Sequence, residues 1–172
     1  FFFKQKTAYE IYQCDWSSDV CSSDLRPVGA KGWGSFATER IPAGTTVAGF
    51  GGWVVTRAML ETFSEDRQGR SIQIDEDLYL VSDDTPEPGD MLNHSCEPNA
   101  ELIWDPVENK AWLTAARDIP AGEEITFDYG FSLAESLTQP CACGAPTCAG
   151  RIIAAPLRPA LRRHLRFSRP RD

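Results

Sequence analysis

The chain has 172 residues, 42% hydrophobic and 24% charged, which is the length of one domain with its own core and excludes disordered and fibrous classes. Its net charge of −8 is uneven, because residues 151–172 carry seven arginines and one aspartate (+6), which leaves −14 on residues 1–150. This acidic body favours basic protein segments over nucleic acid as partners, although solubility alone would also explain the acid.

Residues 1–25 fit nothing that follows them. They show no sustained hydrophobic period and end in a string of serine, aspartate and cysteine. The stretch resembles the conceptual translation of a sequencing adapter, so we treat it as an artefactual leader and leave it out of the fold. If the segment is genuine, Cys14 and Cys21 could form a disulfide.

We find neither a secretion signal nor a membrane span in the sequence. The apolar residues of the first ten precede the lysines, and the longest uncharged run, residues 41–56, contains one proline and four glycines. We therefore expect a protein that is not secreted and has no membrane partner, located in the cytoplasm or, in a eukaryote, in the nucleus.

From Arg26 onward, short apolar segments separated by glycine and proline predict a mainly β fold. Residues 32–52 predict two short strands around a turn at residues 42–44. Residues 56–68 predict the one helix of the body, because the capping residue Thr56 precedes apolar residues at helical spacing. Residues 71–81 predict a further strand region, because they first alternate and then form an apolar run.

Three further elements follow toward the C-terminus. Residues 101–105 and 111–119 predict a hairpin, and residues 156–167 predict a short basic helix. Residues 124–130 alternate as a strand does, which places Phe127 and Tyr129 on one face. Outside a motif, such a pair of aromatic residues would most often belong to a core.

The remaining cysteines predict a metal site. Three of them form the cluster Cys141, Cys143 and Cys148, and a tetrahedral structural zinc ion needs a fourth ligand, for which Cys96 is the candidate left. A disulfide framework is the alternative, and it would suit a secreted chain. His94, two residues from Cys96, is not needed by this metal.

Four motifs in order resemble the signatures of the SET-domain protein-lysine methyltransferases. They are KGWGSFA at 31–37, LNHSCEPNA at 92–100, GEEITFDYG at 122–130 and CACGAPTCAG at 141–150, the last resembling the post-SET zinc motif. The resemblance implies a β-clip fold with a C-terminal pseudoknot. It divides the chain into a SET domain (26–135), a post-SET zinc segment (136–153) and a basic tail (154–172).

The resemblance also implies roles for single residues. Gly32, Trp33 and Gly34 match the loop that binds S-adenosylmethionine, and Asn93, His94 and Ile152 match further contacts to that cofactor. Tyr129 matches the catalytic tyrosine. Phe127 matches the position that controls how many methyl groups are added, and a phenylalanine there implies that di- or trimethylation is permitted.

The function implied is methyl transfer from S-adenosylmethionine to a lysine of a basic protein, such as a histone-like or ribosomal protein. For such an enzyme we expect the substrate groove to be lined from the helix and strand within residues 56–81. Two departures bear on the substrate: residues 90–92 are Asp-Met-Leu where the family often has Arg-Phe-Ile, and the family's usual preceding cysteine-rich domain is absent from this sequence. An inactive SET-fold module that binds lysine-containing peptides is the alternative, as is a zinc-stapled structural protein without a cofactor.

Overall fold

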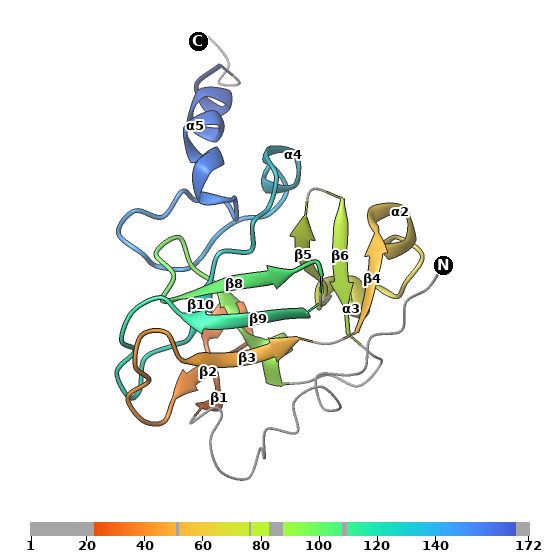
Figure 1. The fold of residues 1–172 in the computed structure, drawn as a ribbon. Helices are drawn as coiled ribbons and strands as arrows, with labels where there is room; N and C mark the ends of the chain where they lie inside the picture. The colour runs from red at the N-terminus through yellow and green to blue at the C-terminus, as the bar shows by residue number, and fades with distance from the viewer. Residues whose placement is uncertain (1–22, 51, 76, 83–87, 108–109, 168–172) are drawn as a thin grey trace.

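A computed structural model describes residues 23–50, 52–75, 77–82, 88–107 and 110–167 (Figure 1). The adapter-like residues 1–22, with Cys14 and Cys21, lie outside this range. The described residues form short strands with few short helices, which confirms the mainly β prediction. No helix among them has the length and apolar character needed to cross a membrane.

The central sheet consists of three antiparallel strands in the order β3 (Thr46–Phe50), β9 (Lys110–Ala115) and β8 (Ala100–Asp105). Residues 111, 113 and 115 of β9 are buried and alternate with partly exposed ones, as expected for a strand with one face on the core. The predicted hairpin of β8 and β9 is confirmed, with Ala100 opposite Ala115.

A second three-stranded sheet lies beside the first (Figure 1). Its order is β4 (Trp53–Thr56), β6 (Leu78–Val81) and β5 (Ile72–Asp75), and all of its pairs are antiparallel. Two helices follow β4: α2 (Arg57–Leu60) and α3 (Glu65–Gly69). The prediction of one helix over residues 56–68 is therefore wrong, because the Ser64 side chain accepts a hydrogen bond from the backbone of Arg67 and starts a second helix.

Two small pairs of strands complete the β structure. β1 (Ser23–Pro27) pairs with β2 (Trp33–Ala37), linked by the 3₁₀ turn η1 (Gly29–Lys31). The strand begins at Ser23, inside the segment that we excluded from the fold. β7 (Asn93–His94), which follows η2 (Pro88–Met91), pairs in parallel with β10 (Thr126–Phe127), so the strand predicted over 124–130 is shorter than expected.

Asn99 holds this parallel pair in place. Its amide is 1% exposed, donates to Oε1 of Glu123 and to the carbonyl of Glu124, and accepts from the backbone of Thr126, each at 2.8 Å. Because the Asn99 amide is buried, leaving its hydrogen bonds unmade is costly. They fix the strand that carries Phe127 beside the segment that carries Asn93.

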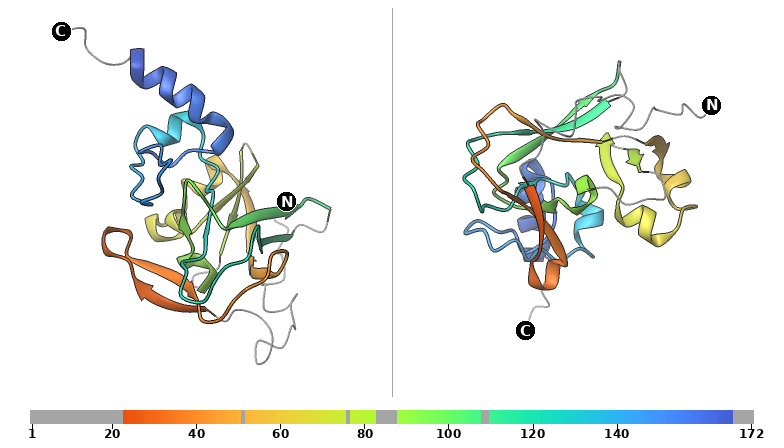
Figure 2. Two further views of the ribbon diagram at one scale, coloured as in Figure 1. Left: turned by 90° about the vertical axis from the view of Figure 1, so that its left-hand side faces the viewer. Right: turned by 90° about the horizontal axis from the view of Figure 1, so that it is seen from below.

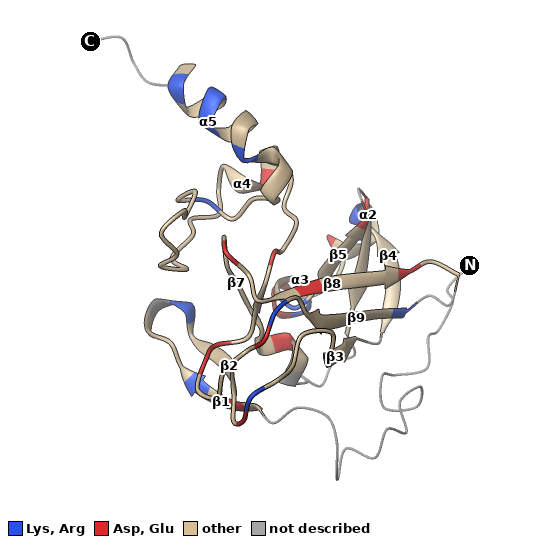
Figure 3. Cartoon of the chain, turned by 60° about the vertical axis from the view of Figure 1, so that its left-hand side comes forward, with Lys and Arg blue, Asp and Glu red and all other residues tan. Residues whose placement is uncertain are grey.

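The C-terminal part lies at one end of the molecule (Figures 1 and 2). α4 (Leu133–Ser136) precedes the cysteine-rich loop, and η3 (Ala155–Leu157) leads into α5 (Arg158–Phe167), which confirms the predicted basic helix. α5 extends away from the sheets, and Leu161 is its buried residue. Basic residues gather on this helix (Figure 3).

Candidate functional site

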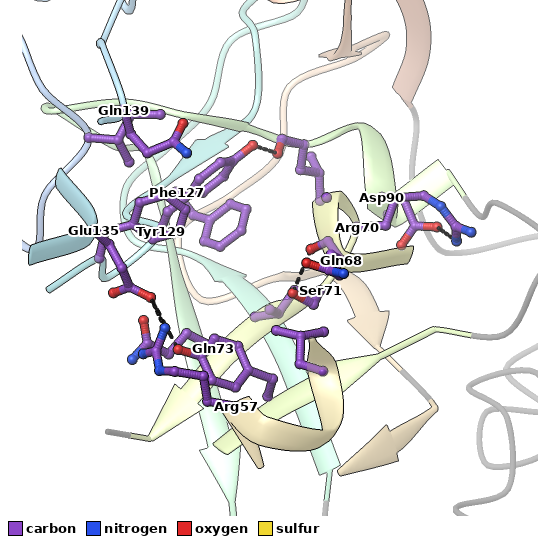
Figure 4. Close-up of a pocket in the computed structure, with 18 of the residues that line it drawn as sticks. Arg57, Gln68, Arg70, Ser71, Gln73, Asp90, Phe127, Tyr129, Glu135 and Gln139 are labelled. Carbon is purple, nitrogen blue, oxygen red and sulfur yellow. Dashed lines mark hydrogen bonds and ion pairs between the residues drawn. The ribbon is translucent and has the colours of Figure 1, made fainter. Parts of the chain in front are cut away.

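A cavity of about 470 Å³ opens between the second sheet and the C-terminal part (Figure 4). This volume is in the range of small-molecule and side-chain binding pockets. Residues from α2, α3, β5 and β6 form one wall, and residues 127–152 form the other. The cavity is lined by Arg57, Leu60, Gln68, Gly69, Arg70, Ser71, Ile72, Gln73, Tyr79, Gly89, Asp90, Leu92, Phe127, Tyr129, Phe131, Glu135, Thr138, Gln139 and Ile152.

Phe127 and Tyr129 both reach this cavity. Their ring centroids lie 4.9 Å apart, so the two rings share a side as the strand alternation predicts. The Tyr129 hydroxyl donates to the carbonyl of Leu92 at 2.9 Å. Burial raises the pKa of Tyr129 to about 12, so its phenol is uncharged at physiological pH.

The opposite wall is tied to the C-terminal part through Glu135. Its Oε1 accepts from Arg57 at 2.8 Å and from the hydroxyl of Tyr79 at 3.1 Å, while Oε2 accepts from the backbone and side chain of Ser132 in a capping box. Burial alone would raise the pKa of Glu135, but hydrogen bonds from Ser132 and Arg57 outweigh it and lower the pKa to about 2. One carboxylate thus starts α4 and joins it to α2.

The cavity lining includes a buried ion pair. Arg70 Nη1 lies 3.1 Å from Oδ2 of Asp90, and their side chains are 8% and 4% exposed (Figure 4). Asp66 accepts from the same guanidinium at 2.8 Å. The expectation that a groove is lined from within residues 56–81 agrees with this lining. Phe131, Glu135, Thr138 and Gln139 were missed, although the Ser132-x-x-Glu135 capping pattern is visible in the sequence.

Gly32, Trp33, Gly34 and Asn93 gather outside this cavity, where β2 begins. The side-chain amide of Asn93 donates to the carbonyl of Trp33 at 2.9 Å. A Cβ atom on Gly34 would lie 2.6 Å from Oε1 of Glu124 and 2.9 Å from Nδ2 of Asn93, so only glycine fits there without displacing them. Gly32 has φ +80°, which glycine adopts without strain.

His94 lies between these groups, with its side chain 2% exposed. Nδ1 accepts from the backbone N–H of Tyr129 at 3.2 Å, and Nε2 lies 3.6 Å from Sγ of Cys96. Burial lowers the pKa of His94, which agrees with a neutral ring that accepts at Nδ1. The imidazole therefore lies within the protein, and it is absent from the cavity lining.

The four predicted cysteines come together, and all are free thiols. Cys96 lies in the loop after β7, and Cys141, Cys143 and Cys148 lie in the loop after α4. All four sulfur atoms lie within 4.8 Å of one another, and those of Cys96 and Cys141 are 3.9 Å apart. Tetrahedral zinc with Zn–S bonds of about 2.3 Å requires sulfur atoms about 3.8 Å apart, so the four thiols fit this ion.

Comparison with known proteins found a matching family and similar structures. The family model "SET domain" matches residues 32–130. The chain is 35% identical over 130 residues, 71% of its length, to the histone-lysine N-methyltransferase ash1 of Drosophila melanogaster, of which it covers 6%. It is 34% identical over 126 residues, 67% of its length, to an H3 lysine-4 specific histone-lysine N-methyltransferase of Mycosarcoma maydis, of which it covers 9%. The chain thus spans less than a tenth of the length of these relatives.

Solved structures with a similar fold include two of KRYPTONITE. One holds mCHG DNA and SAH; it has a TM-score of 0.62 and 29% identity, and the match covers 76% of this chain and 28% of that one. The other holds mCHH DNA, an H3(1–15) peptide and SAH; it has a TM-score of 0.62 and 28% identity, and the match covers 76% of this chain and 29% of that one.

Proposed function

The chain belongs to the SET domain family, and from this premise we propose that it transfers a methyl group from S-adenosylmethionine to a lysine of a basic protein. The observation that carries the proposal is the partly buried, uncharged Tyr129 hydroxyl, held by Leu92 at the wall of a cavity that Phe127 also lines. The names of the relatives and the SAH in both KRYPTONITE structures support the same reaction.

An amine nucleophile needs a site that favours its neutral form. Lysine in water has a pKa of about 10.4, and its neutral form is favoured where the site is poorly hydrated. When bound, S-adenosylmethionine supplies a sulfonium methyl group and a positive charge that disfavours the ammonium form. Tyr129 aligns the amine without a charge of its own, because its phenol keeps its proton up to a pKa of about 12.

Two groups of residues would hold the cofactor and the metal. Gly32, Trp33, Gly34, Asn93 and the backbone around His94 would bind S-adenosylmethionine, with Ile152 as an apolar contact. Cys96, Cys141, Cys143 and Cys148 would hold a structural zinc ion that fastens the C-terminal loop to residue 96.

Phe127 would set the number of methyl groups. Its ring is 4% exposed and lies beside Tyr129 without a hydroxyl that could hold the amine, which leaves room for a methylated nitrogen. We expect di- or trimethylated product from the native chain and a shift toward monomethyl product in Phe127→Tyr, measured by mass spectrometry. Monomethyl product alone from the native chain would contradict this role.

The substrate is proposed to be a basic segment such as a histone or histone-like tail. Residues 1–150 carry a net −14, which would attract such a segment. The H3(1–15) peptide bound to KRYPTONITE is a segment of this kind. In a host whose DNA is packaged by histones, this substrate would place the chain at chromatin.

The testing experiment is a methyl-transfer assay with radiolabelled S-adenosylmethionine on histone H3, ribosomal proteins and an acidic control protein. We expect transfer to a basic protein and a loss of about 100-fold in kcat for Tyr129→Phe. Tyr79→Phe is the matched control, because Tyr79 lines the same cavity but donates to Glu135. Binding of lysine peptides without transfer would favour the inactive module instead.

A further inference from the structure

Glu124 joins two segments that the proposed function assigns to the cofactor. Its Oε2 lies 2.6 Å from Nζ of Lys31, which precedes the Gly32–Gly34 loop, and its Oε1 accepts from Nδ2 of Asn93 at 2.8 Å. The side chains of Lys31 and Glu124 are 22% and 19% exposed. The three residues are far apart in the sequence, and one carboxylate brings them together.

The same carboxylate also packs against the loop backbone. Its Oε1 occupies the space that a side chain at residue 34 would need, since a Cβ there would be 2.6 Å away. The backbone of Glu124 bridges to Phe36 of β2, and the N–H of Ile125 donates to the carbonyl of Ser35 at 2.8 Å. Asn93 in turn donates to the carbonyl of Trp33, so the loop is held from two sides.

The neighbouring Glu123 offers a natural contrast. It accepts from Asn99 and forms an ion pair with Arg117, and neither partner lies on the loop. The two adjacent carboxylates therefore have similar chemistry but different hydrogen-bond and ion-pair partners. A partly buried ion pair is weak evidence for stability, but it can select one conformation of the groups it joins.

We propose that Glu124 is a positioning residue that holds the Gly32–Gly34 loop against Asn93 before the cofactor binds. This inference rests on the proposed function, since that function assigns the loop and Asn93 to S-adenosylmethionine. A loop that is already ordered loses less conformational entropy on binding, so removing Glu124 weakens cofactor affinity more than turnover.

The test measures SAH binding by isothermal titration calorimetry and methyl-transfer kinetics for the same variants. We expect Glu124→Ala to raise the Kd for SAH and the KM for S-adenosylmethionine by about 10-fold, with kcat at saturation changed less than about 3-fold. Glu124→Gln keeps an oxygen for Asn93 but loses the charge for Lys31, so we expect a smaller rise of about 3-fold. Glu123→Gln is the matched control and should bind SAH as the native chain does.

A second variant separates positioning from a general loss of folding. Lys31→Met removes the ion pair from the other side, so it should reproduce Glu124→Gln, and the double variant should add little to either. Thermal unfolding of each variant checks that it folds. An unchanged Kd in a folded Glu124→Ala, or an equal loss in Glu123→Gln, would overturn the inference. A native chain that fails to bind SAH would instead overturn the proposed function.

Discussion

The backbone N–H of Tyr129 donates to Nδ1 of His94 at 3.2 Å, although the two residues are 35 positions apart in the sequence. The other nitrogen of the same ring lies 3.6 Å from Sγ of Cys96. The imidazole thus connects the sulfur cluster to the residue that faces the cavity. We therefore expect a change at the cysteine cluster to alter the position of Tyr129.

Metal removal should loosen both the C-terminal loop and the cavity wall. We expect metal analysis to find one zinc ion per chain, and chelation to lower the midpoint of thermal unfolding by about 10 °C and to abolish methyl transfer. Limited proteolysis should then cut within residues 137–150, because the cluster no longer anchors that loop.

Reductant alone is the control for the metal prediction. It should leave unfolding and activity unchanged, since the four thiols are already free. Loss of stability under reductant without a chelator would favour the disulfide framework.

Replacing Gly34 by alanine should disturb the Gly32–Gly34 loop at its C-terminal end. The added Cβ would meet Glu124 at 2.6 Å and Asn93 at 2.9 Å. We expect the free energy of unfolding to fall by about 1–3 kcal/mol, measured by urea titration, and SAH affinity to fall by about 10-fold. Gly69→Ala is the control for unfolding, because no atom lies within 4 Å of its Cβ position in α3. An equal loss in the free energy of unfolding for both variants would contradict the close contact of residue 34 with Glu124 and Asn93.

Glu135→Gln should destabilise the protein in a pH-dependent way. The pKa of Glu135 is about 2 in the fold and about 4.3 when unfolded, so its contribution is present above pH 4.3 and is lost as the pH falls toward 2. We expect the variant to be less stable at pH 7, on the order of 2 kcal/mol by urea unfolding, with the difference shrinking between pH 5 and pH 2. The exposed Glu61→Gln should show no such difference. A difference in the free energy of unfolding that stays constant down to pH 2 would contradict the lowered pKa of Glu135.

The Tyr129 phenol should ionise far above its ordinary value. Its pKa is raised from about 10 to about 12, so the stability that it contributes is complete below pH 10 and is lost as the pH rises through 12. The difference in absorbance at 295 nm between the native chain and Tyr129→Phe should show a midpoint near 12. A midpoint near 10 would mean that the ring is not buried as described.

The site could be predicted from the sequence where local spacing carries the chemistry. The three cysteines of one short loop required a fourth ligand, and Cys96 lies within reach of them. The alternation around Phe127 likewise predicted that its ring and that of Tyr129 share a side.

Contacts between distant segments could not be predicted in this way. The parallel pairing of Asn93 with Thr126 and the three hydrogen bonds of Asn99 depend on how the chain crosses itself. The helix expected over residues 56–68 is interrupted at Ser64. The side chain of Ser64 caps the start of a second helix, so the first helix does not continue through it. Ser23–Leu25 form part of strand β1 because an edge strand pairs through its backbone N–H and C=O groups, which nearly every residue type carries.

The ligand spacing also has a consequence for the protein while it is being made. Cys141 follows Cys96 by 45 residues, which at about 5–20 residues per second is roughly 2 to 9 s of translation. During that interval Cys96 has emerged without its partners. The last described strand, β10, ends at Phe127, so every strand of the described residues is synthesised before the cysteine cluster can be completed.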